Sequence, residues 1–191
     1  MLFRSVVGDL ALGGEIHVNP PGSAFASTLL PGSYRLFDYT GALSGSTTLG
    51  SIPAGFADSQ VQTVIPGEIN LIAVQDGVPL QFWDGADTSG DGVIDGGTAQ
   101  WNGATGNWTN EAGSINQRWV PGVGVFGGTA GVATLAEPLT ALGLQFATDG
   151  YQLGSTGAPL TLVARPDGSM PFVRVDFGYM EIGRASCRER V

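Results

Sequence analysis

Apolar and polar residues alternate along most of the chain in short runs, and Gly- or Pro-rich corners separate these runs. Alternation with a period of two is typical of β-strands, whose successive side chains point to opposite faces of a sheet. We expect strands in the ranges 9–18, 33–39, 46–49, 60–64, 68–74, 132–135, 142–147, 151–153, 160–163 and 172–177. No window of helical length carries an apolar stripe, so the sequence predicts an all-β protein.

The alternation divides the chain into blocks, which we expect to be β-coils at 1–82, a Trp/Gly/Asp-rich turn block at 83–131 and further β-coils at 132–180. Gly13 and Gly14 interrupt the first run, which should be a strand pair or a strand with a bulge. Both strand blocks consist of short expected strands separated by Gly-rich corners, so they resemble two copies of one unit. A repeated unit that cannot close its own hydrophobic core must stack on neighbouring units. That logic favours a solenoid, although a β-sandwich would also give short strands with frequent turns.

Composition strengthens the β assignment and limits the partners. The chain has 31 Gly and 11 Pro among 191 residues, which suits tight turns and disfavours helix interiors. It has no Lys and a formal net charge of −9, so it lacks the basic surface that nucleic acid or an anionic membrane requires. Neutral glycans, proteins or cations are the partners that remain.

The ends of the sequence differ from the rest. Residues 1–4 lack the basic and apolar regions of a signal peptide, so we expect the sequence to begin within a longer protein. Residues 181–191 contain three of the eight Arg and the single Cys, Cys187, and lack strand periodicity. They resemble the translation of a sequencing adapter, and we expect them to be an artefactual tail. A single thiol forms no internal disulfide and excludes a metal site built from several thiolates.

A set of motifs occurs in a fixed order through the middle of the chain. They are Trp83-Asp84-Gly85, Asp95-Gly96-Gly97, Trp101-Asn102, Asn107-Trp108-Thr109, Asn116, Trp119, Val125-Phe126-Gly127-Gly128, Leu144-Gln145-Phe146 and Gly150-Tyr151-Gln152-Leu153. This order resembles the repeat segment of bacterial autotransporter passengers, and the likeness covers most of residues 8–179. The resemblance implies a fragment of a right-handed parallel β-helix (solenoid) with an irregular Trp/Gly-rich insertion. It also implies export across the outer membrane of a Gram-negative bacterium by the protein's own C-terminal translocator barrel, and display at the cell surface.

The residue types in these motifs suit a β-helix. Inward apolar side chains of stacked coils form columns, for which we expect Phe126, Leu144, Phe146 and Leu153. Gly at corners permits positive φ or a close approach of two backbone segments. The four Trp should cover a corner of the structure; the alternative is that they stack on a ligand.

One constellation could bind a metal. Asp87, Ser89, Asp91 and Asp95 match the start of a calcium loop, with Gly92 between them. The bidentate Glu that would complete the loop is replaced by Thr98, and no flanking helices are expected. The alternative is a hairpin whose Asp-Gly pairs form tight turns. Calcium is therefore a weak candidate, and no other cofactor is predicted.

Catalytic arrangements have less support. An enzyme acting on polysaccharide would need a groove with two close carboxylates beside an Arg. The local acids are Asp84, Asp87, Asp91 and Asp95, and Arg118 lies well away in sequence. His17, the only His, follows Glu15 on an alternating strand without a nucleophilic Ser motif, and we expect it at the surface.

The sequence thus predicts a non-catalytic, structural passenger segment that projects other parts of a surface protein as a stalk. The first alternative is an adhesin that binds host or neighbouring-cell glycans or proteins through the Trp-rich block, and exposed Trp would support it. The others are a polysaccharide-acting β-helix enzyme and a calcium-stabilised module.

Overall fold

A computed structural model describes residues 4–18 and 29–176. Within these ranges the chain is all-β, as the alternation predicts. Because no described residue is helical, none of these segments is a helix that could cross a membrane. The adapter-like tail at 181–191, with Cys187, and residue 177 of the last expected strand lie outside the described residues.

The N-terminal region, residues 4–18 and 29–76, is built largely from parallel pairs. Its strands are β1 (Arg4–Val6), β2 (Leu10–Leu12), β3 (Glu15–Ile16), β4 (Gly32–Tyr39), β5 (Leu43–Gly45), β6 (Thr48–Leu49), β7 (Gln60–Gln62) and β8 (Glu68–Ala73). β1 pairs with β4, β2 with β5 and β3 with β6, each at an offset of 33 residues (37 − 4, 43 − 10 and 48 − 15). The β1–β4 pair extends into a four-stranded sheet of order β1-β4-β8-β7, in which β8 runs antiparallel to both β4 and β7. Gly14, at φ 77°, forms a corner between β2 and β3, which belong to different sheets.

The aromatic region, residues 77–176, contains the remaining strands. These are β9 (Leu80–Trp83), β10 (Ala99–Trp101), β11 (Trp108–Thr109), β12 (Asn116–Gln117), β13 (Val123–Phe126), β14 (Val132–Leu135), β15 (Leu139–Ala141), β16 (Gly143–Phe146), β17 (Gln152–Ser155), β18 (Leu160–Leu162) and β19 (Phe172–Val175). The central sheet has the order β12-β11-β9-β13-β16-β19, and two smaller sheets have the orders β10-β14-β17 and β15-β18. Successive passes of the chain stack in parallel, whereas β11 is antiparallel to β9 and β12. The sheets are therefore small and mixed.

Four strands, β10 to β13, lie within residues 83–131, where the alternation gave no strand. Two of them are two residues long, and Gly-rich turns flank them. Such strands are too short for a period of two to be visible in the sequence. The Trp-rich block is therefore part of the sheet structure, since β9, β11 and β13 are neighbours in the central sheet.

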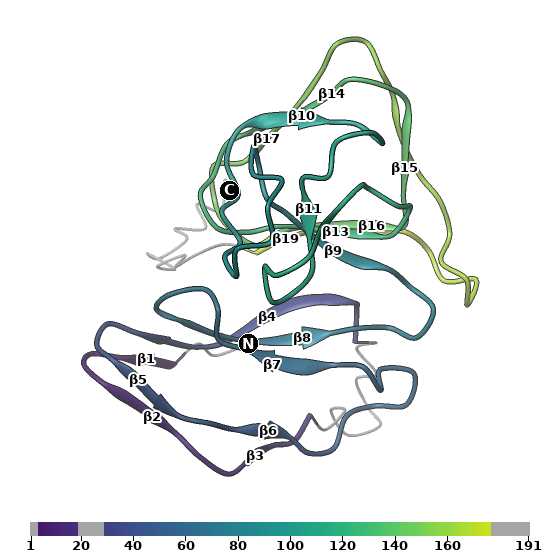
Figure 1. Ribbon diagram of the computed structural model, residues 1–191. Coiled ribbons are helices and arrows are strands. Elements are labelled where there is room, and N and C mark those ends of the chain that lie inside the picture. The colour runs from purple at the N-terminus through teal and green to yellow at the C-terminus, as the bar shows by residue number, and fades with distance from the viewer. Residues whose placement is uncertain (1–3, 19–28, 177–191) are drawn as a thin grey trace, which may run out of the picture.

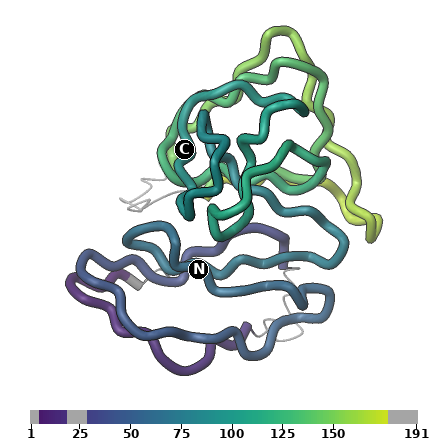
Figure 2. The backbone as a smooth tube through the Cα atoms, viewed as in Figure 1, coloured from purple at the N-terminus to yellow at the C-terminus, as the bar shows by residue number. Residues whose placement is uncertain are grey.

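The central sheet is covered on both faces. On one side Phe126 joins a buried cluster with the four Trp. On the other side Val125 and Phe82 pack against Ile72 of β8. The N-terminal region, purple to blue in Figures 1 and 2, thus lies against one face of the central sheet. This contact creates the boundary at which a cleft opens.

Candidate functional site

The acidic loop after β9 is tethered at its base by Asp84. Its side chain is fully buried, with Oδ1 accepting a hydrogen bond from the Asp95 N–H at 2.8 Å and Oδ2 accepting one from Asn116 Nδ2 at 2.8 Å. Burial raises the pKa of the Asp84 carboxyl above its usual value, because the charged form loses solvation. Asp84 therefore holds the loop closed from inside and does not face solvent.

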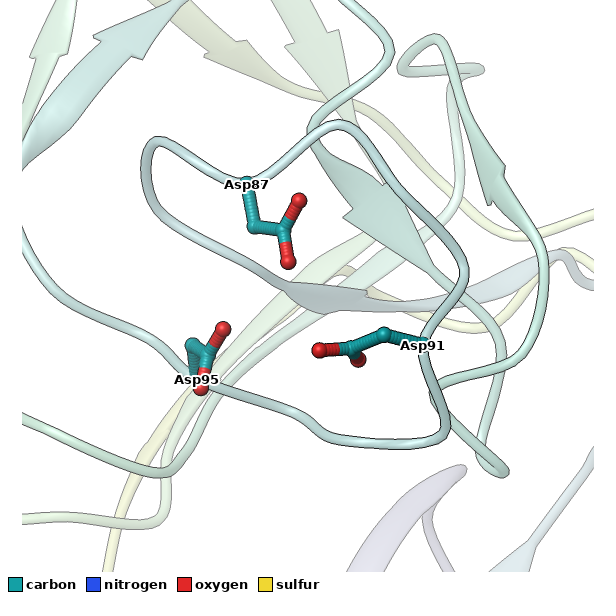
Figure 3. A group of neighbouring side chains, drawn as sticks. All are labelled: Asp87, Asp91 and Asp95. Carbon is teal, nitrogen blue, oxygen red and sulfur yellow. The ribbon is translucent and has the colours of Figure 1, made fainter.

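Three further carboxylates gather at the tip of this loop. One oxygen from each of Asp87, Asp91 and Asp95 lies within 4.8 Å of the others, and Figure 3 shows the three groups around a shared space. Asp87 and Asp91 each also accept a backbone N–H two residues on, from Ser89 at 2.8 Å and from Val93 at 2.9 Å. The loop thus combines the Asx turns of the hairpin alternative with the clustered oxygens that a hard cation prefers. The calcium site stays a prediction.

The four Trp form the core of the aromatic region. Trp83, Trp101 and Trp108 are fully buried and Trp119 is nearly so. Neighbouring rings meet at centroid distances of 4.4 to 5.2 Å, mostly tilted or edge-to-face, as aromatic pairs prefer. No indole face is therefore available to a ligand, and the adhesin alternative does not gain the support that exposed Trp side chains would have given it.

The Phe and Tyr of the repeat motifs extend this core. Phe126 and Phe146 pair in register on adjacent parallel strands, and their rings stack at 4.9 Å with an interplanar angle of 11°. Leu144 is buried beside them. Leu153 was expected in the same columns, but it is 40% exposed, because its strand β17 is an edge strand that pairs only with β14 in the described residues.

The glycines of the motifs allow close backbone contacts. A Cβ on Gly96 (φ 71°) would lie 2.3 Å from Tyr151 Oη and 2.4 Å from the Gly127 carbonyl oxygen. A Cβ on Gly85 (φ 59°) would lie 1.8 Å from the Gly96 carbonyl oxygen. Gly97 (φ 94°) and Gly150 (φ 90°) also require positive φ, although their surroundings are more open. The turn glycines therefore position Tyr151, which donates its hydroxyl to the Gly127 carbonyl at 2.6 Å.

A cleft of about 440 Å³ opens where the two regions meet. The charged and polar residues of its wall are Ser33, Tyr34, Arg35, Asp38, Glu68, Asn70, Thr148, Arg174 and Asp176, and its apolar residues include Ile65, Phe82, Val125, Ala147 and Val175. Arg35 contacts both Glu68 and Asp38, the latter at 3.3 Å. The cleft thus has the pair of carboxylates beside an Arg that was sought near Asp84 and Arg118. Sequence reasoning missed it, because the residues of the cleft come from six separate segments.

Beside the cleft, hydrogen bonds and a cation–π contact connect the two regions; we call this set of contacts the joint. Gln145 is fully buried in the central sheet, and its Oε1 accepts the Ser33 N–H at 2.7 Å while its Nε2 donates to the Ser33 carbonyl at 2.6 Å. Arg174 donates to the same carbonyl at 2.9 Å and lies over the Tyr34 ring at 3.9 Å. It also forms a two-point ion pair with Asp176. These contacts fix the position of β4 relative to β16 and β19.

His17 is exposed, as expected, but it has more partners than the sequence indicated. Its Nε2 lies 3.3 Å from Glu15 Oε2, and its Nδ1 lies 3.0 Å from Ser51 Oγ. The Ser51 backbone N–H also donates to Nδ1 at 3.1 Å, which occupies the lone pair that a general base would use. The arrangement therefore joins the segments that follow the paired strands β3 and β6 and gives no support to nucleophilic catalysis.

We compared the sequence with those of known proteins, and one curated protein is similar to it. No family model matches the chain, and no solved structure matches it. Over 160 aligned residues the chain is 37% identical to the Adhesin BmaC autotransporter of Brucella suis biovar 1 (strain 1330). That relative is an autotransporter adhesin. The alignment covers 77% of this chain, which itself spans 4% of the length of the relative. The likeness to autotransporter passengers that the ordered motifs predict is thus supported by an independent comparison, and the relative's description does not point to an enzyme.

Proposed function

We propose that this chain is a non-catalytic segment of an autotransporter passenger and that it acts as part of a stalk on the cell surface. The observation that carries the proposal is the 37% identity to an autotransporter adhesin over most of the chain. The partner for export would be a C-terminal translocator barrel of the same protein, in the outer membrane of a Gram-negative bacterium. Host or neighbouring-cell glycans or proteins would be the partners of the displayed part.

A right-handed parallel β-helix is the architecture that we propose for this stalk. Leu80, Val123, Gly143 and Phe172 lie in register on successive parallel strands, and a second parallel stack runs through β10, β14 and β17. The antiparallel strands β7, β8, β11 and β12 would be local additions to this coil.

Exposed apolar residues at the last coil support such stacking. They are Leu153, Leu162, Val163, Met170, Val173 and Val175, on or next to the edge strands β17, β18 and β19. Unpaired parallel edges with apolar side chains are places where a further strand adds readily. A further coil stacked here would cover them, so the exposure fits a repeat within a longer array.

Surface display can be tested by placing the chain between a signal peptide and an autotransporter translocator in a Gram-negative host. We expect antibody labelling of the chain on intact cells and its removal by external protease, with the translocator alone as the control. Tandem copies should lengthen the surface structure by a constant increment per copy. A chain that stays inside cells whose translocator is assembled would contradict the proposal, as would copies that add no length.

A calcium-stabilised loop is a second proposal, and the convergence of Asp87, Asp91 and Asp95 favours it. Calcium at ten to a hundred times its dissociation constant would raise the free energy of unfolding by about 1–3 kcal/mol. Melting curves with calcium and with chelator test this, using Asp91→Asn as the variant and Asp58→Asn, on an exposed turn, as the matched control. An identical melting temperature with and without calcium would end the proposal.

A further inference from the structure

The cleft between the two regions has the size and the lining of a small-molecule site. Its volume of about 440 Å³ lies within the range of roughly 300–1,000 Å³ that ligand pockets occupy. Apolar side chains with exposed surface, Ile65, Ala147 and Val175, share the lining with convergent polar groups. This combination lets an apolar face of a ligand rest on one part of the wall while its polar groups bond to another.

The charges of the wall limit the class of ligand. Two guanidinium groups, from Arg35 and Arg174, are paired with the three carboxylates of Asp38, Glu68 and Asp176. An anion entering the cleft would meet more negative than positive charge, and pairing with an Arg would mean displacing a carboxylate already bound there. A neutral group that both donates and accepts hydrogen bonds meets neither obstacle.

Hydroxyl groups satisfy this requirement. A hydroxyl can donate to a carboxylate and accept from a guanidinium at the same time. Asp38 contacts Arg35 through Oδ1 at 3.3 Å, and 30% of the Asp38 side chain is exposed. The Thr148 hydroxyl also lines the cleft. A ligand with several hydroxyls on an otherwise apolar ring matches a wall of this kind.

We propose that the cleft binds a neutral sugar unit, with its C–H face against Ile65, Ala147 and Val175 and its hydroxyls toward Asp38 and Arg35. The site gives the proposed passenger a specific ligand class at a place other than the Trp-rich block. Its biological use rests on the proposed surface display, whereas binding by the purified chain does not.

Ligand-observed NMR and calorimetry on the full chain test the proposal. The probes are N-acetyl-D-glucosamine and methyl β-D-galactoside as neutral sugars, N-acetylneuraminic acid as an anionic sugar and D-glucosamine as a cationic one. We expect saturation transfer to at least one neutral sugar and affinity at least tenfold weaker for the anionic one. Absence of binding by both neutral sugars at millimolar concentration would overturn the proposal, and so would tighter binding of either charged sugar.

Two variants locate the site. Thr148→Trp should fill the cleft and abolish binding, whereas Thr63→Trp, at an exposed position outside the cleft, should bind as the parent chain does. Asp38→Asn keeps the shape of the side chain and should weaken binding at least tenfold, with Asp58→Asn as its control. Unchanged binding by a folded Asp38→Asn protein would place the sugar elsewhere, even if Thr148→Trp fails to fold.

The same samples separate binding from turnover and from display. Release of reducing ends from a neutral oligosaccharide would overturn the assignment of a binding site, because Asp38 and Glu68 would then be acting on the glycosidic bond. Sugar binding by a chain that fails the surface-display test would retain the cleft and reject only the passenger role. Surface display without sugar binding would retain the passenger role and reject the cleft as a sugar site.

Discussion

The N-terminal and aromatic regions contrast in how regular they are and in how well they bury their side chains. In the N-terminal region every parallel pair has the same offset of 33 residues (37 − 4, 43 − 10 and 48 − 15), yet β2, β3, β5 and β6 have no buried residue. In the aromatic region the central strands pair at unequal offsets, from Leu80 to Val123 and from Val123 to Gly143, yet nine buried residues form one cluster. A regular backbone register is therefore no measure of a closed core. Hydrogen-bond spacing and apolar burial are separate properties of these strand pairs.

The contrast also shows how the two regions depend on each other. The best-buried strand of the N-terminal region is β8, where Ile69, Leu71, Ile72 and Ala73 are all buried. Ile72 reaches that state by packing on Phe82 and Val125 of the aromatic region. We therefore expect the aromatic region to carry most of the stability and the N-terminal region to fold against it.

Trp108→Ala should lower the free energy of unfolding more than any other change proposed here. It removes a ring that contacts three other Trp and Phe126. Truncation of a buried aromatic costs about 3–5 kcal/mol of the free energy of unfolding. Leu12→Ala, on a half-buried strand of the N-terminal region, should cost about 1 kcal/mol. Urea denaturation followed by far-ultraviolet circular dichroism measures both.

Ile115→Ala, at a position that is 60% exposed, is the control for that pair and should change stability by less than about 0.5 kcal/mol. Equal losses for Trp108→Ala and Leu12→Ala would remove the contrast between the regions.

A smaller effect is expected from Gly96→Ala. Its Cβ would collide with Tyr151 Oη and with two carbonyl oxygens, and the residue would also be held at positive φ. Together these costs are about 2–4 kcal/mol. Gly97→Ala shares the positive φ without a neighbour within 4 Å, so it should cost only about 1–2 kcal/mol. If the two variants have the same melting temperature, the close contacts around Gly96 add no cost to the substitution beyond backbone strain.

Gln145→Leu tests whether the contacts between the two regions couple their unfolding. The change leaves the buried Ser33 N–H without its acceptor, which costs about 1–3 kcal/mol. Because Gln145 connects the two regions, unfolding should also become less cooperative, with the N-terminal region lost first. Hydrogen exchange of β4 and β8 amides compared with those of β13 checks this, with the exposed Gln152→Leu as control. Uniform acceleration across both regions would show that Gln145 does not act as a joint.

The sequence supported some of these features and concealed others for physical reasons. Alternation located β14, β16 and β18, because four or more residues of period two were available in each range. It could not locate β11 or β12, which are two residues long. The expected apolar column also misplaced Leu153, because the motif shows that this side chain is apolar and not whether another segment covers it.

The candidate sites divide in the same way. The cluster of Asp87, Asp91 and Asp95 was visible because its members lie within one loop. The cleft was not, since Asp38, Glu68 and Arg174 are far apart in sequence and meet only after both regions pack. The spacing of the Trp residues through a turn-rich block predicted that they cover a corner, whereas the structure places all four in one buried core cluster.

The smallest expected effect concerns two tyrosines, one in each region. Burial raises the pKa of Tyr151 to about 12, and burial also raises the pKa of Tyr34 above its ordinary value. A tyrosine whose pKa is raised in the folded state contributes its full share to the free energy of unfolding below pH 10.0, the pKa in the unfolded chain. That contribution is lost as the pH rises toward about 12, the pKa in the folded chain. Tyr151→Phe should cost about 1 kcal/mol at pH 8, through loss of the hydrogen bond to Gly127. Denaturation from pH 8 to 12 should show this difference shrinking above pH 10, and Tyr34→Phe should show the same sign. A difference that stays constant to pH 12 would mean that Tyr151 ionises as readily in the folded chain as in the unfolded one.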